Sequence, residues 1–121
     1  MSLTSNYLRL PFTFDVPNNG SGLLISVGKA DPTGGGVVGD FAPVSGGEGR
    51  IAVSWYFRSP ASESNGVYIS EGIDPQGETN FELLAPGEHT NWPATKPAPY
   101  YRVVADGGAC RITGWALTVP A

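Results

Sequence analysis

Alternation of apolar and polar residues is the strongest pattern in this chain. In residues 50–58 every second side chain is apolar: Ile51, Val53, Trp55 and Phe57. The residues between them, which include Tyr56 and Arg58, share the opposite face. A period of two predicts a strand with one buried face, and so strong a pattern predicts a central strand. No stretch of about ten residues has the i, i+3, i+4 spacing of an amphipathic helix, so we expect an all-β fold.

Two further long strands are predicted near the ends of the chain. From Tyr7 to Val16 the apolar residues fall on even positions: Leu8, Leu10, Phe12, Phe14 and Val16. Pro11 has no N–H to donate to a ladder, so this strand should lie at a sheet edge or break into two pieces there. From Ala109 to Val119 one face carries Cys110, Ile112, Gly114 and Ala116, and the other carries Arg111, Thr113, Trp115 and Leu117.

Shorter strands and turns fill the sequence between these two. We predict strands at Leu23–Val27, Val67–Ser70, Phe81–Leu84 and Tyr100–Ala105. Residues 17–22 and 106–108 predict hairpin turns, and Pro86-Gly87 predicts a type II turn. Residues 93–99 hold three prolines and should run extended without regular pairing. About seven to nine short strands indicate a single-domain antiparallel β-sandwich or jelly-roll-like barrel spanning residues 1–121.

Glycine and proline are abundant but unevenly placed. The chain has 17 glycines and 11 prolines, yet 40% of its residues are hydrophobic and only 15% are charged, which is too apolar for a disordered protein. Glycine is concentrated between Gly20 and Gly49. We therefore expect a long glycine-rich loop at residues 28–49, and we expect residues 1–6 to form an N-terminal arm.

The charge of the chain excludes some classes of partner. Seven Lys and Arg residues against 11 Asp and Glu residues give a net charge of −4, so a nucleic-acid backbone is not an expected partner. No apolar run approaches the ~20 residues that a membrane span needs. The first ten residues lack the charged and apolar regions of a signal peptide. We expect neither a membrane partner nor secretion.

No catalytic or metal-binding group of residues emerges from the sequence. The only cysteine, Cys110, lies in an apolar strand and is expected to be a buried, inert thiol, because the only histidine, His89, lies in a Pro/Gly-rich turn region. Residues 34–39 match G-x-G-x-x-G, but no helix follows to face a phosphate. The loop carboxylates do not follow the order of a calcium-binding loop. We expect no enzyme activity, no cofactor and no metal.

Aromatic residues outside the predicted core are candidates for binding. Trp92 lies in a polar, proline-rich segment, and Tyr100 and Tyr101 follow shortly after it. An exposed cluster of these rings suits sugar stacking or a protein interface. The alternative is that Trp92 folds back and closes one end of the sandwich.

Three segments of the second half carry a resemblance to a known class of proteins. They are Asn65-Gly66-Val67-Tyr68-Ile69, the run Phe81-Glu82-Leu83-Leu84-Ala85-Pro86-Gly87-Glu88, and the stretch from Tyr101 to Trp115 that contains Ala105-Asp106-Gly107-Gly108-Ala109. Together they resemble small β-sandwich proteins that decorate the heads of tailed bacteriophages or form virion appendages. The resemblance covers Asn65 to Leu117.

The resemblance implies a non-enzymatic virion protein, made in the host cytoplasm, that binds the outside of an assembled capsid. Such a protein stabilises the lattice of major capsid protein by bridging neighbouring subunits, often as a trimer or dimer. Polar, glycine-rich segments can order on a partner, so we place the contacts in the arm, the long loop and the aromatic segment. The candidate contact residues are Leu3, Tyr7, Val37, Val38, Phe41 and Trp92. The alternative function is a carbohydrate-binding β-sandwich module that uses Trp92, Tyr100 and Tyr101.

Overall fold

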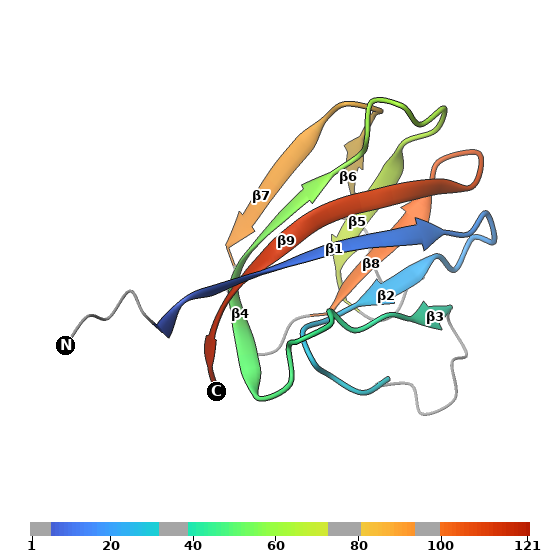
Figure 1. Ribbon diagram of the computed structural model, residues 1–121. Helices are drawn as coiled ribbons and strands as arrows, with labels where there is room; N and C mark the ends of the chain where they lie inside the picture. The colour runs from blue at the N-terminus through green and yellow to red at the C-terminus, as the bar shows by residue number, and fades with distance from the viewer. Residues whose placement is uncertain (1–5, 32–38, 73–80, 94–99) are drawn as a thin grey trace.

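A computed structural model describes residues 6–31, 39–72, 81–93 and 100–121 of the chain. The described residues form nine strands and no α-helix (Figure 1). The strands are β1 (Leu8–Val16), β2 (Leu23–Ile25), β3 (Asp40–Phe41), β4 (Arg50–Arg58), β5 (Val67–Glu71), β6 (Glu82–Leu84), β7 (His89–Pro93), β8 (Tyr101–Ala105) and β9 (Cys110–Pro120).

The strands form two sheets that pack face to face (Figure 1). One is four-stranded, in the order β1-β9-β4-β7, and the other is five-stranded, in the order β3-β2-β8-β5-β6. Every pair is antiparallel except β2 with β3, so the five-stranded sheet is mixed rather than purely antiparallel. The predicted β-sandwich is confirmed.

The pairing order is that of a jelly roll. The first strand pairs with the last, β2 with β8, β4 with β7, and β5 with β6. The chain is thus one long hairpin that rolls up into two sheets, held closed by the β4–β9 and β5–β8 pairs. The short strand β3 extends the five-stranded sheet beside β2.

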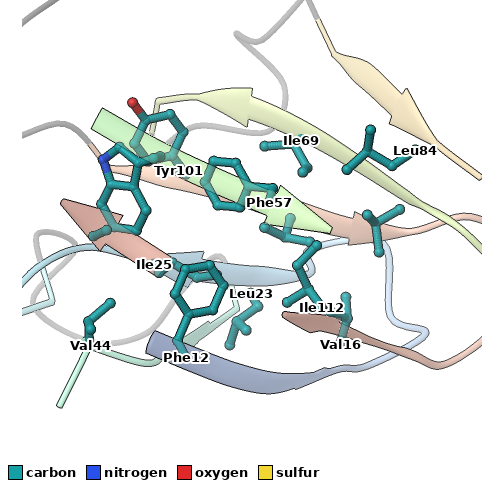
Figure 2. Close-up of a cluster of buried hydrophobic side chains, with 14 of the residues drawn as sticks. Phe12, Val16, Leu23, Ile25, Val44, Phe57, Ile69, Leu84, Tyr101 and Ile112 are labelled. Atoms are coloured by element: carbon teal, nitrogen blue, oxygen red, sulfur yellow. The ribbon is translucent and has the colours of Figure 1, made fainter. Parts of the chain in front are cut away.

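The inward side chains of both sheets form one hydrophobic core. Trp55 is 1% exposed, and its ring centroid lies 5.5 Å from that of Phe57 and 4.9 Å from that of Tyr101. Figure 2 shows Phe12 from β1 and Ile112 from β9 pointing into the same cluster. The core therefore joins strands from both ends of the chain, as the first-with-last pairing requires.

A bulge in β4 corrects the predicted face of one residue. β4 is central, between β9 and β7, as predicted, and Trp55 and Phe57 point into the core. The register shifts between Ala52 and Ser54, so Ala52 is buried and Ile51 is 37% exposed. One extra residue in a strand reverses the face of everything before it. The prediction that Ile51 shares a face with Trp55 was wrong for this reason.

Strand β1 is an edge strand, which agrees with the prediction from Pro11. It pairs only with β9 and continues through Pro11 without breaking. Leu10, Phe12 and Val16 are buried, but Leu8 is 47% exposed. Periodicity assigns a residue to a face of a sheet but does not show how far the opposite sheet covers that face.

Both predicted hairpin turns connect strands that do not pair with each other. Residues 17–22 join β1 to β2, and residues 106–108 join β8 to β9, and in both cases the chain passes from one sheet to the other. The hairpin predictions were wrong because a turn signal fixes local geometry and not the pairing partner. The type II turn is confirmed: Gly87 has φ 93°, and the amide of Glu88 donates to the Ala85 carbonyl over 2.9 Å.

Two elements lie where the sequence predicted loops. Strand β7 begins at His89, and its last residue, Pro93, needs no N–H for a further bond. Part of the glycine-rich loop packs on the five-stranded sheet: β3 lies there, and Val44 is fully buried while its amide donates to the Ser26 carbonyl over 2.9 Å. Residues 39–49 of the predicted loop at residues 28–49 are therefore part of the packed domain, and residues 32–38 of that loop and residues 94–99 of the predicted extended segment lie outside the described residues.

Candidate binding surface

The only cysteine is in a buried, weakly reactive environment, as predicted. Cys110 is 7% exposed, and its Sγ lies 3.5 Å from the Gly66 carbonyl oxygen, to which it donates. Burial, followed by the negative charges of Glu63 and Asp106, raises the pKa of the thiol. A raised pKa lowers the fraction of reactive thiolate at neutral pH.

We expect the Cys110 thiol to react with a disulfide reagent at pH 8 at least about tenfold more slowly in the folded protein than in urea. The reason is the combination of restricted access and raised pKa. Following thionitrobenzoate release with and without urea measures both rates. Equal rates would contradict the buried environment.

Metal and membrane signatures are absent from the described part of the chain. Among these residues no three His, Cys, Asp or Glu side chains come close enough together to hold a metal ion. The same residues include no helix long and apolar enough to cross a membrane.

The structure describes Tyr7, Phe41 and Trp92 among the predicted contact residues. Leu3, Val37 and Val38 lie outside the described residues. Tyr7, just before β1, is 50% exposed, and Phe41 in β3 is partly buried.

Trp92 is not an exposed loop residue, and the alternative that it closes onto the sandwich is confirmed. It lies in β7 and points inward, with its ring 5.3 Å from Tyr101 and edge-on to Phe57 at 6.0 Å. Its Nε1–H donates to Oε2 of Glu82 over 2.6 Å. Because Glu82 lies in β6, this bond ties the edges of the two sheets together.

The predicted sugar-stacking group does not form. Tyr101 is fully buried, and burial together with the charge of Glu71 raises the pKa of its hydroxyl. The hydroxyl of Tyr100 donates to the Ala30 carbonyl over 2.8 Å. A stacking platform needs open ring faces, and Tyr101 has none.

Four side chains instead form a ladder across the outer face of the four-stranded sheet. They are Arg9, Trp115, Tyr56 and His89, one from each of β1, β9, β4 and β7, in the order of the strands. The register brings Tyr56 directly opposite Trp115, and their rings stack at 5.3 Å with an angle of 11°. The guanidinium carbon of Arg9 lies 4.2 Å from the indole centroid, and the His89 ring lies 5.5 Å from Tyr56. We call these four residues the outer-face ladder.

In the ladder, neighbouring side chains cover the faces of the aromatic rings, and the edges of the Trp115 and Tyr56 rings point towards solvent. β1 and β4 flank β9 on opposite sides, so Arg9 and Tyr56 cover the two faces of the Trp115 ring. Trp115 and Tyr56 nevertheless remain partly exposed. Edges of stacked aromatic rings next to arginine suit contact with protein side chains better than stacking against a sugar ring, which needs an open face.

Apolar residues continue the outer face beyond the ladder. Leu117 and Val119 follow Trp115 on the same face of β9, since they lie two and four residues along the strand. Val119 pairs with Ile51, which the bulge turns outward, and Tyr7 lines a shallow groove with Val119. We call Tyr7, Ile51, Leu117 and Val119 the apolar end of the outer face.

The outer face carries more positive than negative charge. Arg9, Arg58 and Arg111 point outward from its strands, and within the described residues Asp15 is the only acidic side chain that does so. Asp15 pairs with Arg111, with Oδ1 and Nε 3.3 Å apart. This excess is local, because the whole chain has a net charge of −4.

No family model, curated protein or solved structure matches this chain. Jelly rolls serve in viral capsids and in lectins, so the fold alone does not decide the function.

Sequence reasoning missed the ladder although it placed two of its members correctly. The alternation put Tyr56 on the face of its strand opposite Trp55, and Trp115 on the face of its strand opposite Cys110. What was missing was the register of β4 against β9 and the existence of β7, which supplies His89. An outward tryptophan in a long terminal strand was the available signal.

Proposed function

We propose that this protein is a non-enzymatic structural protein of a bacteriophage virion. It binds the outside of the assembled capsid and stabilises it by bridging neighbouring subunits. The observation that carries the proposal is the outer face of the four-stranded sheet, where the ladder and the apolar end present Trp, Tyr, Arg and aliphatic side chains to solvent.

The composition of the outer face favours a protein as the partner. Trp, Tyr and Arg are the residues that contribute most to protein interfaces; Trp115 and Tyr56 lie on the two central strands of the face, and Arg9 lies beside Trp115 on the edge strand β1. Strands β9 and β4, beneath the two rings, are paired on both sides, so this part of the surface is rigid before it binds. Rigid surfaces lose little conformational entropy on binding.

A repeated lattice makes a small interface sufficient. Weak contacts that recur on every subunit of a symmetric shell add through avidity, above all when the bound protein is itself a trimer or dimer. Bridging needs a second contact surface besides the outer face. The N-terminal arm, residues 1–6, and the loop at residues 28–49, which contains Phe41, remain the proposed second surface.

Reconstitution on capsids tests this proposal. Heads of the phage whose genome encodes the chain are assembled without it, and purified protein is added at increasing ratios. We expect saturable co-sedimentation and regular extra density on the head surface, together with a higher temperature of head disruption. Absence of binding at saturating protein, or a genome without a capsid gene, would contradict the proposal.

A glycan array separates this function from carbohydrate binding. We expect no glycan-specific signal with the wild-type protein, because both faces of the Trp115 ring are covered. A specific glycan signal that disappears in Trp115→Ala but not in Tyr68→Ala, a variant of the other sheet, would contradict the capsid proposal.

A further inference from the structure

The arginines of the outer face differ in how they are engaged. Arg111 is paired with Asp15, whereas Arg9 and Arg58 are exposed and form no ion pair with any described residue. Arg9 lies at the β1 end of the outer-face ladder, and Arg58 follows Tyr56 by two residues along β4, opposite His89 in the register. The stacked rings of Trp115 and Tyr56 lie between these two cations, neither of which has an ion-pair partner among the described residues.

The geometry points to an acidic segment of a partner protein as what this face recognises. We propose that a carboxylate of that segment binds Arg9, a second binds Arg58, and the apolar side chains between them rest on the edges of Trp115 and Tyr56. This inference rests on the proposed function in taking a protein as the partner, and it adds the chemistry by which the partner is chosen.

The position of Arg9 prepares it to bind a carboxylate. Its guanidinium lies over the indole of Trp115 at 4.2 Å, which holds it in place through the ring face. A guanidinium that lies parallel to an aromatic ring keeps its in-plane N–H groups available for two parallel hydrogen bonds to a carboxylate. A lysine at this position would keep the charge but lose the paired geometry.

Charge complementarity favours an acidic protein segment over nucleic acid. A phosphate backbone presents a continuous row of charges and needs a stripe of many cations, but within the described residues this face has two arginines without an ion pair and one histidine. Leu117, Val119 and Ile51 continue the face as apolar surface, which a phosphate backbone cannot use. A peptide segment in which carboxylates alternate with apolar side chains would match both the arginines and the apolar surface.

Selection from a random-peptide library tests the inference without knowledge of the partner. The wild-type protein is immobilised, and enriched peptides are sequenced and their affinities measured. We expect enrichment of peptides in which Asp or Glu flanks apolar residues, and weaker binding as ionic strength rises. Enrichment of neutral or basic peptides, or tighter binding of a short DNA duplex than of any peptide, would overturn the inference.

Paired variants locate the binding to the ladder. We expect Arg9→Ala to weaken the selected acidic peptides about tenfold or more, and Arg9→Lys to recover only part of this loss. The matched control is Arg111→Ala on the same face, which should change affinity less than about twofold because Arg111 is already paired. Circular dichroism shows that each variant is folded. Equal effects of Arg9→Ala and Arg111→Ala would overturn the inference.

Arg9→Ala together with a further variant, Arg58→Ala, distinguishes failure of this inference from failure of the proposed function. Heads that bind wild type, Arg9→Ala and Arg58→Ala equally well would overturn the inference and leave the capsid function standing. Acidic peptides that bind the ladder while heads do not bind the protein would support the inference and contradict the capsid function.

Discussion

The Trp55→Ala variant is expected to lose about 3–5 kcal/mol of unfolding free energy. Trp55 is 1% exposed and packs against Phe57, Tyr101 and Phe12, with ring centroids 4.9–6.1 Å away. Alanine would leave a cavity between the two sheets that rigid neighbouring strands cannot close. Since small domains are stable by only about 5–15 kcal/mol, this variant should be close to unfolding at room temperature. Urea denaturation followed by circular dichroism measures the loss.

Trp115→Ala is the matched control for this prediction. Trp115 lies on β9, next to β4, but points outward, so its removal should cost only about 1 kcal/mol, the size of a cross-strand pair. Similar losses for the two tryptophans would contradict the assignment of inner and outer faces.

The Gly114→Ala variant is expected to lose about 3 kcal/mol or more, although it adds only one methyl group. A Cβ at this position would overlap the carbonyl oxygen of Tyr56 in the neighbouring strand and would lie 2.8 Å from Cζ of Phe12. The carbonyl belongs to the backbone of β4, so relief of the overlap requires β4 and β9 to separate. Thermal unfolding of the variant measures the cost.

Gly20→Ala controls for the general cost of replacing a glycine. Gly20 has φ 76°, and nothing lies within 4 Å of the added Cβ, so only the backbone conformation is penalised, by about 1 kcal/mol. A Gly114→Ala variant no less stable than Gly20→Ala would contradict the close approach of β4 and β9.

Local features of the fold were predictable from the sequence, and pairing was not. Alternation identified the strands around Trp55 and Phe12, and Pro11 correctly predicted an edge strand. The same signals could not show that residues 17–22 and 106–108 cross between sheets, because pairing of the first strand with the last depends on contacts about a hundred residues apart. The β4 bulge turns Ile51 outward, yet the apolar–polar alternation of residues 50–58 continues through it without a break.

The candidate surface was less predictable than the fold, for a related reason. Trp92 and Tyr101 looked exposed because their segment is rich in proline, yet β7 turns Trp92 inward and the core encloses Tyr101. In the sequence, Trp115 only shares a strand face with polar residues such as Arg111 and Thr113. The register that places it opposite Tyr56 makes it part of the ladder. Binding surfaces on sheets depend on neighbours across strands, which a single sequence does not specify.

Hydroxyl-radical footprinting of the protein, free and bound to heads, tests whether the outer face of the four-stranded sheet is the contact surface. We expect Trp115 and Tyr56 to become protected on binding, while Tyr68 and Leu83 of the five-stranded sheet react as before. Protection of Tyr68 and Leu83 with Trp115 and Tyr56 unchanged would contradict it.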